Sequence, residues 1–172
     1  FPENWISKDI SKKDLAPYVY PDESKISEVK LKAFYFSYFF KWSMLDNFNY
    51  VKNKMPSFKT NPNKRTRGTF TDFDSLDDKV DCLYYYMQYI KFGFGRATRD
   101  SCRMIQNNQM ERSEAINLAR KYDSEFPEDD FDEVLKYLDI NMDEFNEIVD
   151  KHRNNEIWKS SVNNKWELIN TI

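Results

Sequence analysis

From residue 75 onward, apolar side chains recur at helical spacing, and this periodicity constrains the fold more than any other feature. Steps of four and three residues place one set on a single helix face, namely Leu76, Val80, Leu83, Met87 and Ile90. Ser75 and Asp78 resemble a capping pair at the start of this helix, and glycines at 93 and 95 are expected to end it. Further helices are predicted at about 97–105, 113–122 and 131–138. A last one follows the capping pair Asn141 and Glu144 and carries Phe145, Ile148 and Val149.

The rest of the chain predicts little regular structure. Short helices are expected within 7–15, 24–29 and 44–55. Residues 33–40 are aromatic on both faces, which favours a strand buried on both sides. Residues 157–162 and 165–168 predict a hairpin that turns at Asn163 and Asn164. The expected fold is therefore mainly α with a small β contribution.

Several functions are excluded by residue types that the chain lacks. It has 3 Gly, at positions 68, 93 and 95, so no G-x-x-x-x-G-K-[ST] or G-x-G-x-x-G phosphate loop is present. The only histidine, His152, lies far from Cys82 and Cys102. This excludes a Ser-His-Asp or Cys-His arrangement and argues against a metal site. No apolar run approaches the ~20 residues of a membrane span, and two unpaired cysteines fit a cytoplasmic protein.

The net charge of −3 hides an asymmetry. Residues 1–112 carry +5 and residues 113–172 carry −8. The basic part could face anionic ligands, whereas the acidic part is expected to solvate helices. A charge of +5 does not by itself argue for nucleic acid, and RNA binding would rest only on the basic loop at 59–69.

Two glycine-containing segments are candidates for binding an anion. The first places Lys91, Arg96 and Thr98 around Gly93 and Gly95, and a helix N-terminus with a hydroxyl and cations suits phosphate or carboxylate. The alternative is a glycine that ends one helix before a solvated helix start.

The second segment is the loop at 64–69, with Arg65, Thr69 and Gly68, and its alternative is a solvated loop. Five aspartates lie between 72 and 81, where they are expected to complement a helix dipole. The alternative is that some of them hold magnesium.

These segments carry a resemblance to a known family. Five segments look like parts of the C-terminal half of N-acetyl sugar amidotransferases. They are I-K-F-G-F-G-R-A-T at 90–98, R-T-R-G-T at 65–69, Y-D at 122–123, E-F-P at 125–127 and the aromatic stretch at 34–42. The resemblance runs through nearly the whole chain in order. Arg67 stands where the family commonly has an acidic residue, and Ser37 where it often has Gly.

The resemblance implies a PP-loop ATP pyrophosphatase fold, of the adenine nucleotide alpha hydrolase type, and a role in lipopolysaccharide (O-antigen) or flagellin-glycan synthesis. ATP would adenylate the acetamido oxygen of a nucleotide-activated N-acetyl sugar, and ammonia from a separate glutaminase would displace AMP to leave an acetamidino group. ATP and Mg²⁺ are the implied cofactors. The family's S-G-G-K-D-S loop is absent, so this part alone is expected to be inactive.

Carried over by position, the resemblance assigns phosphate or substrate binding to seven residues and no catalytic role to any residue of this chain. They are Lys91, Gly93, Gly95, Arg96, Thr98, Arg65 and Thr69. Residues 1–60 would be the tail of the nucleotide-binding domain, with the 33–40 strand completing its sheet and exposed where that domain is missing. Residues 61–172 would form a helical C-terminal region. A non-catalytic helical interaction module is the alternative.

Overall fold

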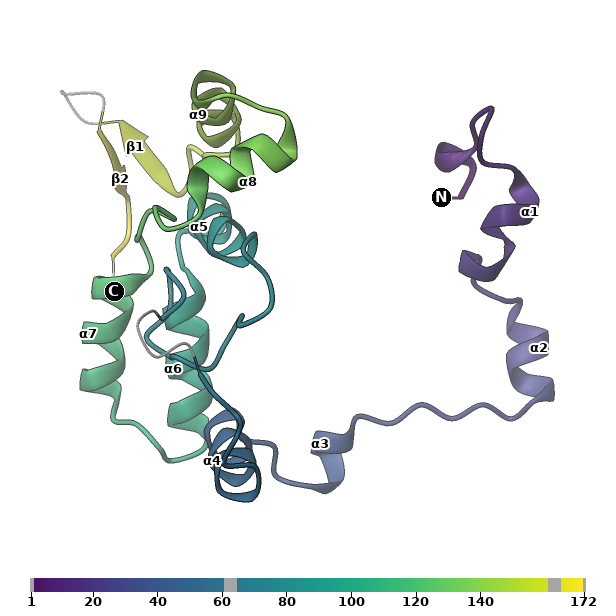
Figure 1. Ribbon diagram of the computed structural model, residues 1–172, viewed down its shortest axis with the longest axis horizontal. Helices are drawn as coiled ribbons and strands as arrows, with labels where there is room; N and C mark the ends of the chain where they lie inside the picture. Colours follow the sequence, from purple (N-terminus) through teal and green to yellow (C-terminus); the bar gives the residue numbers. More distant parts are fainter. Residues whose placement is uncertain (1, 61–64, 161–164, 172) are drawn as a thin grey trace. The chain divides into compact units, whose positions relative to one another are not determined.

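The computed structural model describes residues 2–60, 65–160 and 165–171 and divides the chain into two compact units, Phe1–Lys41 and Trp42–Ile172. Most of the described residues are helical, and the strands among them form one two-stranded sheet (Figure 1). The predicted fold class, mainly α with a small β contribution, is confirmed. The two units divide after Lys41, and helix α4 (Met44–Lys54) belongs to the second. Phe48 of α4 stacks on Phe73, with ring centroids 4.5 Å apart.

The first unit is a series of helical turns without a core. They are η1 (Pro2–Trp5), α1 (Lys12–Leu15), η2 (Ala16–Tyr18), α2 (Glu23–Glu28) and α3 (Phe36–Phe39). Local capping stabilises α1, since Ser11 accepts from the Asp14 backbone N–H and Asp14 accepts from that of Ser11. Between residues 3 and 41 no side chain is buried.

The buried strand predicted at 33–40 is wrong for this structure. Residues 36–39 form α3, and the aromatic side chains around it are exposed, Tyr35 to 86% and Tyr38 to 84%. The described strands, β1 and β2, pair only with each other, so an extended backbone at 33–40 would leave its N–H and C=O groups without ladder partners. A helical turn satisfies some of them locally, for example Phe40 N–H to Phe36 C=O at 3.2 Å.

The core of the second unit lies between α5 (Asp81–Phe92), α8 (Phe131–Leu138) and α9 (Met142–Lys151). Each fully buried aliphatic or aromatic side chain there contributes roughly 1.5–3 kcal/mol. The buried set is Leu83, Ile90, Phe131, Val134, Leu135, Phe145 and Val149. Alongside it, α6 (Arg96–Gln106) packs against α7 (Arg112–Tyr122).

The predicted helices agree with α6, α7, α8 and α9, and Asn141 and Glu144 form the expected capping box of α9. The predicted start at residue 75 is wrong, because α5 begins at Asp81. Ser75 has a φ of +53°, outside the right-handed helical region, and its hydroxyl is hydrogen-bonded to that of Tyr85. Asp78 instead accepts from the Val80 N–H at 2.8 Å, just before the helix.

The predicted hairpin is present as β1 (Trp158–Ser160) and β2 (Trp166–Leu168), which pair antiparallel with Trp158 opposite Leu168. The turn expected at 163–164 lies outside the described residues. Trp158 is buried and its indole Nε1 donates to the carbonyl of Ile90 at 2.7 Å. The sheet is thereby fixed to the last turn of α5, next to the glycine segment.

Candidate functional site

The fold brings the two glycine-containing segments into direct contact. The backbone N–H of Ala97, in the first turn of α6, donates to the carbonyl of Gly68 at 3.0 Å. The loop at 65–69 and the N-terminus of α6 therefore form one site, although some thirty residues separate them in the sequence. We call the two segments, 65–69 and 91–98, together the glycine motif.

The N-terminus of α6 is capped by a carboxylate of the protein itself, that of Asp123. The Asp123 carboxylate accepts from the Thr98 backbone N–H at 2.9 Å and from the Thr98 hydroxyl at 2.5 Å. Gly95 leaves room for it, since a Cβ at that position would lie 2.7 Å from Asp123 Oδ1. A carboxylate at a helix N-terminus satisfies orphan N–H groups and complements the helix dipole.

Arg96 is buried and surrounded by acceptors. Its Nε donates to Asp100 at 2.8 Å, its Nη2 lies 3.2 Å from Asp74 Oδ1, and its Nη1 donates to the Tyr85 hydroxyl at 2.7 Å. Burial lowers the pKa of Arg96, but Asp100 and Asp74 outweigh that effect and hold the pKa above its ordinary value. With two carboxylates in contact, this guanidinium joins α6 to the loop at 71–74 in the present structure.

The loop at 65–69 is held in the same way. Thr69 is fully buried, and its hydroxyl donates to Asp100 Oδ2 at 2.9 Å. Arg65 makes a two-pronged ion pair with Glu125, with Nη1 2.6 Å from Oε2, and also donates to the Thr69 carbonyl at 2.8 Å. Glu125 further accepts from the Gly68 N–H at 3.1 Å. Burial lowers the pKa of Arg65, and Glu125 more than compensates, so that it lies above its usual value.

Lys91 and Gly93 lie at the end of α5. Gly93 has a φ of +74°, and its N–H donates to the Tyr89 carbonyl at 2.8 Å, as in a left-handed helix cap. A Cβ there would lie 2.7 Å from Ile157 Cγ2. Lys91 is exposed, and its Nζ lies 5.6 Å from the ring centroid of Phe92. Of the predicted cations, Lys91 therefore presents its charge to solvent, whereas Arg65 and Arg96 are ion-paired.

Sequence reasoning missed the acidic residues that complete this site. Asp123 and Glu125 follow α7 and are separated from their partners by 25 residues or more. Local spacing rules such as i, i+4 carry no signal for contacts of this length. The one sequence signal that pointed to Asp123 and Glu125 is that they stand in the Y-D and E-F-P strings of the family resemblance.

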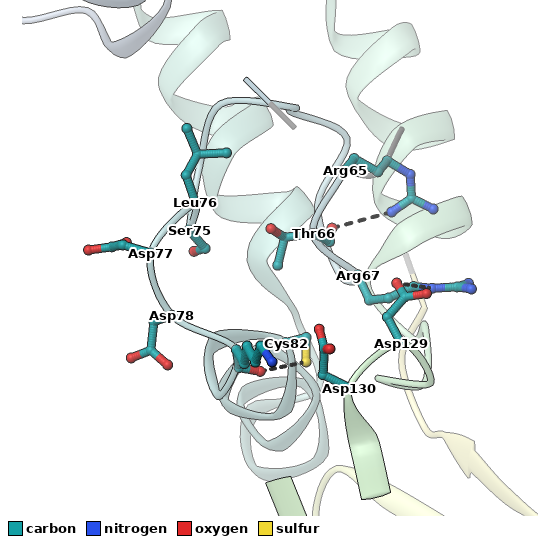
Figure 2. Close-up of a pocket in the computed structure, with 11 residues that line it drawn as sticks. Arg65, Thr66, Arg67, Ser75, Leu76, Asp77, Asp78, Cys82, Asp129 and Asp130 are labelled. Carbon is teal, nitrogen blue, oxygen red and sulfur yellow. Dashed lines mark hydrogen bonds and ion pairs between the residues drawn. The ribbon is translucent and has the colours of Figure 1, made fainter. Parts of the chain in front are cut away.

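A pocket of about 300 Å³ lies beside the 65–67 loop (Figure 2). In the figure, Asp77 and Asp78 lie across the pocket from Arg65 and Arg67, with Asp129 and Asp130 nearby. Arg67 is ion-paired with Asp129 and Glu128, both at 3.2 Å. Four aspartates and three cations line this pocket, and the excess of negative charge disfavours a polyphosphate there.

The described residues do not fit a magnesium ion. Within 2–60, 65–160 and 165–171, no three His, Cys, Asp or Glu side chains are grouped so as to ligate a metal. Asp74, from the acidic run at 72–81, pairs with Arg96 and accepts from the Thr71 hydroxyl at 2.7 Å.

The family model for the LPS biosynthesis protein WbpG-like C-terminal domain matches residues 67–172, more than half of the chain. The chain belongs to this family. The match includes most of the glycine motif, the acidic residues at 123 and 125, and the hairpin; residues 1–66, with Arg65, lie outside it. A comparison with curated proteins found no match. Within the part of the chain that the structure describes, no helix of this WbpG-like domain is long and apolar enough to cross a membrane.

Proposed function

We propose that this chain is the C-terminal part of an ATP-dependent N-acetyl sugar amidotransferase of lipopolysaccharide or flagellin-glycan synthesis. The observation that carries the proposal is the WbpG-like family match across the segment that contains K-F-G-F-G-R-A-T. The contact between this segment and the 65–69 loop supports it, because both parts of the resemblance meet in one site.

In the proposed reaction, the acetamido oxygen of a nucleotide-activated sugar attacks the α-phosphorus of ATP and pyrophosphate leaves. An amide oxygen is a poor leaving group until it is esterified in this way. Ammonia, supplied by a separate glutaminase, then adds to the imidate carbon. The C–O bond breaks, AMP leaves, and loss of a proton yields the acetamidino group.

The glycine motif would supply a rigid binding platform. Arg65, Thr69, Arg96 and Thr98 would shape it, since each bonds a carboxylate of Glu125, Asp100 or Asp123. Lys91 is the residue we assign to direct contact with a phosphate of ATP or of the sugar nucleotide, because it is exposed at the edge of the motif. Gly93 and Gly95 would serve the platform indirectly, because their missing Cβ atoms make room for Ile157 and for Asp123.

The aromatic segment at 34–42 would pack against the nucleotide-binding part of the enzyme. Seven of its side chains are more than half exposed, including Phe34 and Phe40. Helices of four to six residues, such as those of the first unit, are not stable in water on their own. A large apolar surface of this kind marks an interaction site, and the proposed function supplies the second surface.

The test uses the full-length enzyme, in which the proposed function requires an S-G-G-K-D-S loop upstream of residue 1. It is incubated with ATP, a UDP-linked N-acetyl sugar and ammonium, and AMP and the amidine product are measured. We expect Lys91→Ala to raise KM for ATP or for the sugar nucleotide by about tenfold, the loss of roughly one charged contact. Lys136→Ala, an exposed lysine of α8, is the matched control and should leave both constants unchanged.

Unchanged constants in Lys91→Ala would refute the phosphate role of Lys91. An absence of AMP and amidine with every UDP- and CMP-linked N-acetyl sugar tried would refute the proposed reaction and favour the helical interaction module.

A further inference from the structure

A second pocket, of about 310 Å³, opens on the other end of the glycine motif. It lies where α5 and α7 end, next to the end of β2. Gly93 of the motif and Asp123, whose carboxylate caps α6, line it together with Tyr89, Arg120, Ser124 and Asn170. The pocket therefore shares its wall with the residues that cap α6.

The inner part of this pocket is rigid. The Tyr89 ring packs edge-to-face on Trp158, with centroids 5.3 Å apart at 83°, and Trp158 is itself hydrogen-bonded to α5. Asp123 is oriented by its two bonds from Thr98. Burial, together with the charge of Asp123, raises the pKa of Tyr89, so its hydroxyl keeps its proton at neutral pH.

The polar groups of the pocket select a ligand rich in hydroxyls. Each oxygen of Asp123 accepts one bond from Thr98 and can accept another. The last carbonyls of α7 lie at the negative end of the helix dipole and also favour a donor. Ser124 and Asn170 add exposed groups that both donate and accept, and Tyr89 adds an aromatic wall.

Size and charge narrow the ligand further. A volume of about 310 Å³ is at the lower limit of small-molecule pockets and suits one sugar ring rather than a whole nucleotide. Arg120, exposed at the end of α7, provides a cation at the pocket's edge.

We propose that this pocket binds the sugar ring of a sugar phosphate, with Tyr89, Asp123, Ser124 and Asn170 around the ring and Arg120 toward the phosphate. Only the biological role of the pocket rests on the proposed function, in which the pocket would be the sugar subsite of the amidotransferase. The binding itself requires neither ATP nor the rest of an enzyme.

The test is an amide-resolved NMR titration of this chain with N-acetylglucosamine 1-phosphate, N-acetylglucosamine and inorganic phosphate. We expect saturable shifts at Gly93, Ser124 and Asn170 with the sugar phosphate, and weaker ones with the sugar. Ser124→Trp should fill the pocket and weaken sugar phosphate binding at least about tenfold. Arg120→Ala should weaken binding of the sugar phosphate but not of the sugar. Lys136→Ala, which removes a cation elsewhere, should change neither.

Asn170→Ala provides a second variant that leaves the core intact, and it should also weaken sugar binding. The proposal is overturned if the sugar phosphate causes no saturable shift at these three amides. It is also overturned if inorganic phosphate reproduces the whole effect, or if Ser124→Trp and Asn170→Ala bind as wild type does. The NMR titration contains no ATP, so the two proposals can fail separately. Sugar phosphate binding in the titration, combined with no amidination in the full-length assay, would refute the proposed reaction and leave the pocket assignment standing.

Discussion

Replacing Asp123 with alanine should destabilise the chain strongly, although the residue lies outside every helix and strand. Its carboxylate accepts the Thr98 N–H at 2.9 Å and the Thr98 hydroxyl at 2.5 Å. Hydrogen bonds to a charged group contribute about 1.5–3 kcal/mol each, and the charge at a helix N-terminus adds about 0.3–1 kcal/mol. Allowing for non-additivity, we expect Asp123→Ala to lower the free energy of unfolding by about 3 kcal/mol. That is a large part of the 5–15 kcal/mol typical of a domain.

The assay is urea denaturation followed by tryptophan fluorescence. Asp123→Asn keeps one acceptor oxygen and loses the charge, so its loss should be about half as large. Glu147→Gln, an exposed carboxylate on α9, is the control and should stay within about 0.5 kcal/mol of wild type. If Asp123→Ala unfolds at the wild-type urea concentration, Asp123 does not cap α6 and the reasoning about the glycine motif fails.

Three further predictions concern the same region. Cys102 is exposed, whereas burial raises the pKa of the Cys82 thiol. At pH 8, Ellman's reagent should therefore label Cys102 rapidly and Cys82 slowly, and the labelling rate of Cys82 should still rise above pH 9. Equal labelling rates would contradict the burial of Cys82. Gly93→Ala should lower the free energy of unfolding by at least about 1–2 kcal/mol through its left-handed φ of +74° alone, and an unchanged urea midpoint would rule out that backbone geometry. Trp158→Phe should cost about 1–3 kcal/mol because the Ile90 carbonyl loses its indole donor; a wild-type thermal midpoint would show that this bond is absent.

The second half of the fold could be predicted because its signals are local. The capping box at Asn141 and Glu144 and the spacing of Phe131, Val134 and Leu135 are settled within one or two helical turns. Their side chains then meet in the core between α5, α8 and α9. Local periodicity was sufficient there because propensity, capping and burial agree.

The sequence predicted poorly wherever distant residues decide the structure. The pattern at 33–40 has a strand's composition but no described partner strand, so it forms a helical turn. Ser75 looks like a helix cap, yet its hydroxyl is bound to Tyr85 and the helix starts six residues later. These outcomes depend on tertiary contacts that no local window contains.

The candidate site shows the same division. Its basic and glycine residues were identifiable from composition and spacing, and the structure joins their two segments. The carboxylates of Asp123 and Glu125 were not identifiable as their partners, because these contacts cross from α6 and the 65–69 loop to the end of α7. Only Asp100, four residues after Arg96 on the same helix, lies at a spacing that local rules cover. The result is a motif whose cations are largely neutralised internally, which is why Lys91 is the residue assigned to contact substrate phosphate.

The most direct test of the account is a mass-spectrometric assay of the full-length enzyme with ATP, ammonium and a nucleotide-linked N-acetyl sugar. The account predicts that oxygen is exchanged for NH in the acetamido group and that one AMP and one pyrophosphate appear per product formed. Formation of ADP, or a product without AMP, would contradict the adenylation on which the proposed function depends.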